Sequence, residues 1–137
     1  MKCRAAGIII YRIRKINMQI EFLGLAATEY FSKISKGIYD IPKGQINPGE
    51  IPFDCAKREC LEETGLIYND VEYGPYKDDG LWLWLTECNG NPVLGINPHT
   101  GLHEHLDYAW LSPEEMENTC FDYLAPSIRW ARKLLNV

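Results

Sequence analysis

A glycine-containing loop followed by an acidic helix is the feature that most constrains this chain. Residues 43–49, Lys-Gly-Gln-Ile-Asn-Pro-Gly, are dense in turn formers and predict a loop. Pro52 suits a first helical position, helix-compatible residues run on to Thr64, and Gly65 suits the left-handed position just past a helix end. The helix is predicted to pack on a sheet through one face, made of Phe53, Ala56, Cys60 and Thr64.

Three glutamates crowd one side of this predicted helix. Glu59, Glu62 and Glu63 fall within about a third of the helix circumference. Like charges at these spacings repel, and the helix dipole disfavours acids in the last turn, so the arrangement opposes folding unless a cation offsets it. Hard oxygen ligands on a rigid helix suit Mg²⁺ or Mn²⁺. Taken alone, the cluster also fits a solvated acidic face that binds nothing.

The wider spacing decides between these two interpretations. Glycines and charged residues recur at fixed intervals through the loop and the helix, at Gly44, Glu50, Arg58, Glu59, Glu62, Glu63 and Gly65, and the aliphatic Leu66 follows. This pattern resembles the Nudix box, the signature of the Nudix hydrolase family, and one position departs, since Cys60 stands where a larger aliphatic residue is usual. The resemblance implies an α/β fold, specifically an α/β/α sandwich with a mixed central sheet. The length of 137 residues predicts a single domain over residues 1–137.

The resemblance also assigns roles around a divalent metal, Mg²⁺ or Mn²⁺. It implies that Glu59 and Glu63 are metal ligands and that Glu62 completes the site directly or through water. The carbonyl oxygen of Lys43 or Gly44 is a further candidate ligand. Metals held there would neutralise pyrophosphate oxygens and lower the pKa of the water that attacks phosphorus.

Arg58 and two further glutamates complete the predicted catalytic group. The planar guanidinium of Arg58 can hold a carboxylate in its fork, and its expected partners are Glu50 across the loop and the neighbouring Glu59. Such contacts would orient Glu59 and also close the loop on the helix. Nudix enzymes often place an additional ligand or general base just before a later strand, which points to Glu104, with Glu59 as the competing base.

Residue type and position suggest which side chains contact the substrate. Tyr76 can stack on a base, although a surface role fits it equally well, and Lys77 and Lys43 can meet phosphates. His103 is predicted to contact phosphate rather than zinc, because the histidines at 99, 103 and 105 lack a second ligand cluster at zinc spacing.

The remaining chain alternates strand and helix patterns. Strands are expected at residues 5–11 and 20–26, forming a hairpin, and at 38–41, 70–76, 81–88 and 105–111. Continuous apolarity over residues 81–85 predicts a strand covered on both faces, with Trp82 and Trp84 in the core. A capping box at residues 112–115 and aliphatic residues at helical spacing near the C-terminus predict two closing helices.

Charge and cysteine content narrow the partners. The net charge of -5 disfavours a broad grip on DNA or RNA backbone. The five cysteines form an odd set without a Cys-x-x-Cys pair, so they are expected as buried free thiols in a reducing cytoplasm. The longest apolar runs are too short for a membrane span, so no membrane partner is expected. A monomer and a homodimer are both compatible with the sequence.

Segments outside the box indicate the substrate class. Residues 3–10, 20–23, 42–44 and 104–110 resemble asymmetric diadenosine tetraphosphate hydrolases, which implies cleavage of a dinucleoside tetraphosphate to ATP and AMP. Gln45 departs from this group, which commonly has histidine there, and the region after Lys77 is short. Residues 46–50 also resemble RNA 5′-pyrophosphohydrolases, and a (d)NTP-sanitising pyrophosphatase is a third alternative. A Nudix-fold module that only senses a nucleotide is the alternative from another class.

Overall fold

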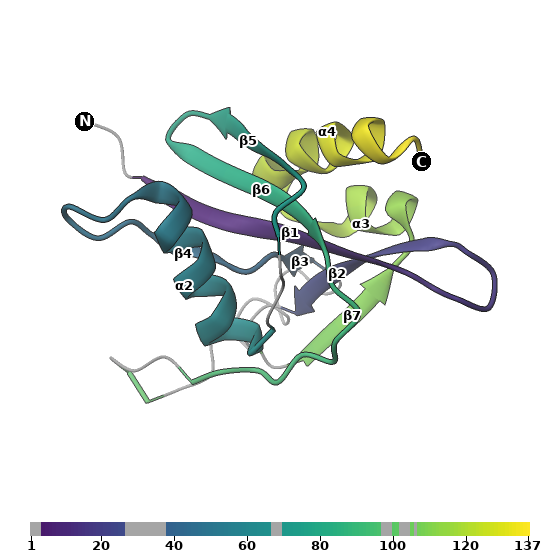
Figure 1. The fold of residues 1–137 in the computed structure, drawn as a ribbon, viewed down its shortest axis with the longest axis horizontal. Coiled ribbons are helices and arrows are strands. Elements are labelled where there is room, and N and C mark those ends of the chain that lie inside the picture. The colour runs from purple at the N-terminus through teal and green to yellow at the C-terminus, as the bar shows by residue number, and fades with distance from the viewer. Residues whose placement is uncertain (1–3, 27–37, 67–69, 97–99, 102–104, 106) are drawn as a thin grey trace.

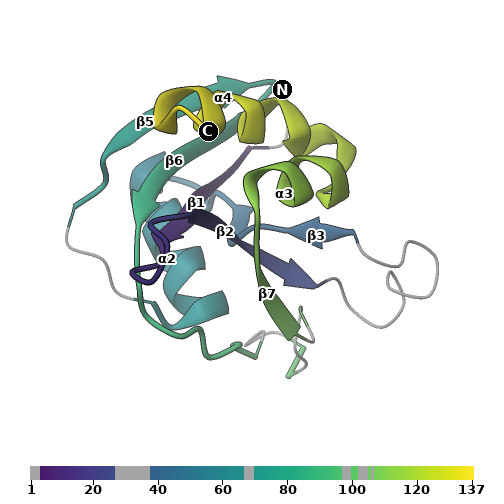
Figure 2. The ribbon, with the colours of Figure 1, turned by 90° about the vertical axis from the view of Figure 1, so that its right-hand side faces the viewer.

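A mixed β-sheet lies between helices in the computed structural model, which describes residues 4–26, 38–66, 70–96, 100–101, 105 and 107–137. In these ranges seven strands form the sheet. Helix α2 (Pro52–Thr64) covers one face, and helices α3 (Pro113–Thr119) and α4 (Ala125–Leu135) cover the other (Figure 1). Figure 2 shows the same layers from the side, with α2 and the α3–α4 pair separated by strands. This is the expected α/β/α sandwich.

The sheet combines antiparallel and parallel pairs. Its strands are β1 (Ala5–Ile13), β2 (Ile20–Ala26), β3 (Tyr39–Asp40), β4 (Lys43–Gln45), β5 (Tyr73–Asp78), β6 (Leu81–Glu87) and β7 (Asp107–Leu111). The main path runs β3-β2-β1-β6-β5, with β4 beside β1 and β7 beside β2. β1 runs parallel to β6 and antiparallel to β2 and β4. The parallel pair needs a crossover, and α2 lies in the chain between its two strands.

Strand β1 is buried on both faces because its side chains alternate between two hydrophobic cores. Ile8 and Ile10 join the core beneath α2, whereas Ile9 and Tyr11 join the core beneath α3 and α4. The parallel neighbour β6 follows the same alternation, with Leu83 in the α3–α4 core and the tryptophans Trp82 and Trp84 packed against the α2 core. Coverage of the 81–85 strand on both faces is therefore confirmed, whereas the two tryptophans are only partly buried at the margin of the α2 core.

Helix α2 begins and ends where the sequence predicts. Pro52 occupies its first turn, and Gly65 adopts a left-handed φ of 66° and donates its N–H to the carbonyl of Leu61 at 2.9 Å. Ala56, Cys60 and Thr64 are fully buried against the sheet. The ring of Phe53 lies 5.0 Å from that of Trp84, which completes the predicted packing face.

Several strand boundaries differ from the sequence expectation. Residues 43–45 form strand β4 rather than part of the loop, because the first residues of β1 provide antiparallel partners for their backbone groups. The strand expected at 38–41 is confined to Tyr39–Asp40, and the one expected at 105–111 begins at Asp107. The strand expected at 70–76 runs instead over Tyr73–Asp78, with a register irregularity between Tyr73 and Tyr76.

The C-terminal helices and the cysteines agree with the predictions. Ser112 and Glu115 form the expected capping box at the start of α3, and a short 3₁₀ helix, η1 (Asp122–Leu124), leads into α4. Four cysteines are buried free thiols, namely Cys55, Cys60, Cys88 and Cys120, and Cys3 lies outside the described residues. None of the helices described is both long and apolar enough to cross a membrane.

Candidate active site

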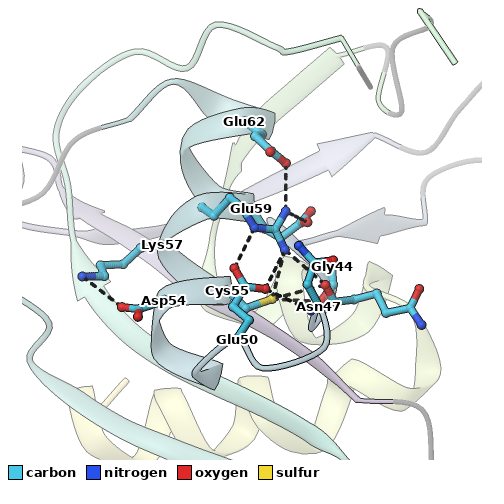
Figure 3. Close-up of polar contacts among 10 residues, drawn as sticks. Gly44, Asn47, Glu50, Asp54, Cys55, Lys57, Glu59 and Glu62 are labelled. Atoms are coloured by element: carbon cyan, nitrogen blue, oxygen red, sulfur yellow. Dashed lines mark hydrogen bonds and ion pairs between the residues drawn. The ribbon is translucent and has the colours of Figure 1, made fainter. Parts of the chain in front are cut away.

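The guanidinium of Arg58 is the centre of the loop–helix unit. It binds Glu50 with two hydrogen bonds, from Nε to Oε2 at 2.8 Å and from Nη2 to Oε1 at 2.9 Å. Nη1 donates to Glu59 at 2.7 Å and to Glu62 at 3.3 Å, and Nη2 also reaches the carbonyl of Gln45 at 3.2 Å. Figure 3 shows Glu50, Glu59 and Glu62 gathered around these contacts. Both partners predicted for Arg58, Glu50 and Glu59, are confirmed.

The loop carries Glu50 to Arg58 through its own turn. The N–H of Glu50 donates to the carbonyl of Asn47, and the N–H of Asn47 donates to the Glu50 carboxylate at 3.0 Å. Gly49, with a φ of 79°, supplies the left-handed conformation that this turn requires. Hydrogen bonding to Arg58 is the main reason that the pKa of Glu50 falls from 4.5 to about 2.

This lowered pKa predicts how the ion pair responds to pH. Glu50→Gln is expected to destabilise the protein by about 1 to 2 kcal/mol near neutral pH, since it removes a charge-assisted pair. The carboxylate pKa is lower in the folded state, so its stabilisation is complete above pH 4.5 and lost as pH falls through about 2. Urea unfolding of both proteins at about pH 6, 4 and 3 measures the difference in unfolding free energy. A difference that grows on acidification would contradict the assignment.

Gly44 is required for contact with Glu59 rather than for a turn. A β-carbon at this position would overlap the Glu59 carboxylate, and the φ of Gly44 is not positive. The sequence prediction counted Gly44 among the turn formers of the loop, and this is wrong: the position needs glycine because a side chain would collide with Glu59. The missing side chain lets the backbone of β4 lie directly against the carboxylate, which is 13% exposed.

The three helix glutamates face different surroundings. Glu59 lies between Arg58 and Gly44, and the side chain of Glu62 is 40% exposed. Glu63 is 7% exposed, and its Oε2 accepts the N–H of Lys43 at 3.1 Å. Among the residues that the structure describes, no three acidic, histidine or cysteine side chains already enclose a cation-sized space. The predicted ligands therefore lie on one helix but do not form a closed cage.

The donor chemistry of the unit nevertheless fits a hard divalent cation. Glu59, Glu62 and Glu63 supply carboxylate oxygens from one rigid helix, which is the ligand type that Mg²⁺ and Mn²⁺ prefer. The absence of a side chain at Gly44 gives the Glu59 carboxylate its place against β4, because a β-carbon there would overlap it. The carbonyl oxygen of Gly44 lies on β4 opposite Ala6 of β1, with the Cys55 thiol 3.5 Å away.

The end of α2 is capped by a distant segment. The N–H of Val93 donates to the carbonyl of Thr64 at 2.8 Å, and the N–H of Gly95 donates to the carbonyl of Glu63 at 3.2 Å. These bonds satisfy carbonyls at the negative end of the helix dipole, where Glu62 and Glu63 stand. The repulsion that the sequence predicts between the helix glutamates and the negative end of the helix dipole is therefore reduced by these backbone hydrogen bonds as well as by the charge of Arg58.

Lys43 combines a buried stem with two partners for its ammonium. Its Nζ lies 3.4 Å from Asp40 and 5.4 Å from the centre of the Tyr123 ring. Burial by itself would lower the pKa of Lys43, but the carboxylate of Asp40 and the contact with Tyr123 raise it above its ordinary value. Lys43 therefore carries a stable positive charge beside helix α2.

The structure does not bring Tyr76 and Lys77 together. Tyr76 packs on Trp130 of α4, with ring centres 5.5 Å apart, whereas the Nζ of Lys77 lies 4.5 Å from the centre of the Trp82 ring. Neighbouring residues of a strand point to opposite faces, so Lys77 lies on the α2 side of the sheet and Tyr76 on the α4 side. The predicted sites at Glu104 and His103 lie outside the described residues.

Three residues near the unit were not marked by the sequence pattern. Asp40 and Tyr123 carry no recognisable signal, and His105 carries only one, its place next to Glu104. Asp40 and His105 nevertheless lie beside Glu63 and Lys43. Tyr123, in η1, is 54% exposed and places its ring beside Lys43. Sequence reasoning misses them because their contacts link positions far apart in the chain.

Comparison with known proteins agrees with this geometry. The model of the NUDIX domain matches residues 1–133. The mouse protein "Bis(5'-nucleosyl)-tetraphosphatase [asymmetrical]" is 34% identical over 133 residues, covering 84% of this chain and 82% of the relative. The pig protein with the same description is 43% identical over the same length, again covering 84% of this chain and 82% of the relative.

Solved structures support the fold. A Caenorhabditis elegans Ap4A hydrolase binary complex superposes with a TM-score of 0.73 at 24% identity, covering 98% of this chain and 99% of that one. The NUDIX domain of Shewanella oneidensis NrtR, solved with ADP ribose, gives a TM-score of 0.70 at 16% identity, covering 98% and 89% respectively. With the family match over nearly the whole chain and the Arg58-centred loop–helix unit, these findings show that the chain belongs to the Nudix hydrolase family, a group of hydrolases that act on acid anhydrides.

Proposed function

We propose that this chain hydrolyses diadenosine tetraphosphate asymmetrically, giving ATP and AMP. The observation that carries the proposal is the 43% identity to asymmetrical bis(5'-nucleosyl)-tetraphosphatases across 84% of the chain. The Arg58-centred unit supports it, because Arg58 gathers three acids of the box, Glu50, Glu59 and Glu62, into one ordered cluster. We also propose that residues 1–137 act as one cytoplasmic domain, as a monomer or homodimer, without DNA binding.

The proposed metal-binding residues are Glu59, Glu62, Glu63 and the carbonyl of Gly44. Bound there, Mg²⁺ or Mn²⁺ would neutralise pyrophosphate oxygens and lower the pKa of the attacking water. The protein's part is to hold these ligands rigidly. Arg58 holds Glu59 at 2.7 Å, and the backbone of Lys43 holds Glu63 at 3.1 Å.

A carboxylate takes the proton of the attacking water. Glu59 is the candidate within the described residues, since Arg58 fixes its orientation and the missing side chain of Gly44 accommodates its carboxylate. Glu104 is the other candidate base or additional ligand. As the proton moves to the carboxylate, the water oxygen bonds to phosphorus and the phosphoanhydride oxygen leaves with the departing nucleotide.

The proposed nucleotide-binding residues include a positively charged side chain for a phosphate and an aromatic ring for a base. Lys43 carries its charge beside the exposed ring of Tyr123, so a phosphate and a base can be held at neighbouring positions. His103 is a proposed phosphate contact. Tyr76 remains a proposed base contact and Lys77 a proposed phosphate contact, but the two act separately because they lie on opposite faces of the sheet.

Product analysis tests this function directly. Diadenosine tetraphosphate, 5′-triphosphorylated RNA, ADP-ribose and a set of dNTPs are each incubated with the protein and Mg²⁺, with EDTA in parallel, and the products are separated by chromatography. We expect ATP plus AMP from diadenosine tetraphosphate, and no turnover in EDTA. Release of two ADP molecules would contradict asymmetric cleavage. Turnover of RNA alone would select the RNA pyrophosphohydrolase, and turnover of dNTPs alone the sanitising enzyme.

A non-catalytic nucleotide sensor is the alternative from another class. Such a module has no need of the four box glutamates, and this chain retains all of them in ordered contacts around Arg58 or Lys43. Binding of nucleotide without any product in Mg²⁺ or Mn²⁺ would select this alternative.

A further inference from the structure

A ring of polar contacts links Glu63 of the Nudix box to three residues outside the specified positions of the box, namely Asp40, Lys43 and His105. The Nδ1 atom of His105 lies 3.5 Å from Oε1 of Glu63, and its Nε2 atom lies 3.4 Å from Oδ2 of Asp40. Oδ1 of Asp40 lies 3.4 Å from the ammonium of Lys43, whose backbone N–H donates to Oε2 of Glu63. The four residues therefore form a closed circuit.

The circuit joins four separate parts of the chain. Asp40 lies on β3, Lys43 on β4 and Glu63 on α2, and His105 precedes β7. The side chains of His105, Glu63 and Asp40 are only 8%, 7% and 14% exposed, so water screens these contacts weakly. Charged groups this well buried are expected to hold one arrangement, since each would lose a partner by rotating.

Asp40 determines the orientation of the His105 ring. Desolvation would raise the pKa of Asp40, but hydrogen bonding to His105 and the charge of Lys43 lower it below its ordinary value, so the group is an ionised acceptor. The Nε2 atom of His105 lies 3.4 Å from Oδ2 of this carboxylate, which anchors that edge of the ring. The opposite edge of the ring is thereby turned toward Glu63.

We propose that His105 and Asp40 are positioning residues for Glu63. The two oxygens of the Glu63 carboxylate face different elements, Oε2 the backbone of β4 and Oε1 the imidazole of His105. The hydrogen bond from the Lys43 N–H at 3.1 Å and the 3.5 Å approach of the imidazole come from different directions, and together they restrain the plane of the carboxylate. Partners of this kind typically change metal affinity or activity by about 10- to 100-fold when removed. The inference rests on the proposed role of Glu63 as a metal ligand.

Equilibrium titration with Mn²⁺ alone, in the absence of nucleotide, tests the proposal. Isothermal titration calorimetry is carried out on the wild type, His105→Ala and Asp40→Asn, and urea unfolding of each protein is measured alongside. We expect about a 10- to 100-fold weaker Mn²⁺ affinity for His105→Ala and a smaller loss for Asp40→Asn. With substrate, the same variants should lower kcat more than they raise KM.

Two amide replacements of His105 test whether the ring positions Glu63 or only supports the fold. The amide nitrogen of Asn can take the place of Nδ1, whereas that of Gln extends toward the place of Nε2. His105→Asn should therefore recover Mn²⁺ affinity toward the wild-type value, and His105→Gln should not. A matched control is Glu117→Gln, which removes the negative charge from a 2.7 Å ion pair with Arg132 between α3 and α4 and should leave Mn²⁺ affinity unchanged.

Three results of the Mn²⁺ titrations would overturn the positioning role of His105. Wild-type Mn²⁺ affinity in His105→Ala, even in a destabilised protein, would overturn the proposal, as would equal recovery by Asn and Gln. A wild-type protein that binds no Mn²⁺ would also overturn it. Failure to cleave diadenosine tetraphosphate would contradict the proposed substrate. The Mn²⁺ affinities of the wild type and the variants could still be compared, because the titration contains no nucleotide.

Discussion

Glu63→Gln is expected to lower kcat by about a thousandfold or more while the protein stays folded. A bound metal contributes several kcal/mol of transition-state stabilisation, and each factor of ten in rate corresponds to about 1.4 kcal/mol. The amide of Gln has nearly the volume of the carboxylate, and its oxygen can still accept the N–H of Lys43. The change therefore removes the charge that holds the metal without opening a cavity.

The measurement is kcat at saturating Mg²⁺, together with the circular dichroism spectrum and the urea midpoint. Asp54→Asn is a matched control, because Asp54 lies on the same helix, is 56% exposed and forms an ion pair with Lys57 at 3.6 Å, away from the Arg58 cluster. It should turn over at the wild-type rate. Undiminished turnover by Glu63→Gln would refute the ligand assignment.

Gly44→Ala is expected to reduce kcat by about a hundredfold and to cost about 1 to 3 kcal/mol of stability. The added β-carbon would overlap the Glu59 carboxylate, so either Glu59 or strand β4 must move. Since Arg58 holds Glu59 and residues 5–7 hold β4, both movements break existing hydrogen bonds. Displacement of the proposed base and ligand by even about an ångström is enough to slow catalysis strongly.

Gly49→Ala is the control for the effect of a methyl group on the same loop. A β-carbon at Gly49 meets no atom within 4 Å, and the substitution is penalised only by its positive φ of 79°. We expect a loss of about 1 kcal/mol in unfolding free energy and near-wild-type kcat. Equal loss of activity in the two variants would show that loop stability, and not the space beside Glu59, controls the rate.

The parts of the site that depend on neighbouring residues were predictable. The bounds of α2, the left-handed Gly65 and the packing face at Ala56 and Cys60 follow from local preferences and helical periodicity. The Glu50–Arg58 contact was predicted from the spacing in the Nudix box. These features depend on a continuous stretch of about twenty residues, within which covalent geometry limits the alternatives.

Features that depend on distant segments were predicted less well. Residues 43–45 became a strand because β1 offers them hydrogen-bonding partners. Tyr76 and Lys77, adjacent in sequence, were separated by the sheet itself, whose two faces pack against different helices. Sequence spacing shows neither which strand becomes a neighbour nor what covers each face.

The sequence by itself determined the family, the catalytic helix and the set of acids on it, because these depend on residue type and on spacing along one helix. Only the tertiary structure decided that Glu63 is buried while Glu62 faces solvent, and that Gly44 gives Glu59 its space. It also placed Asp40 and His105 behind Glu63. The physical reason is that burial and electrostatic partners are set by segments that meet only when the sheet assembles, whereas helical spacing exists before any packing occurs.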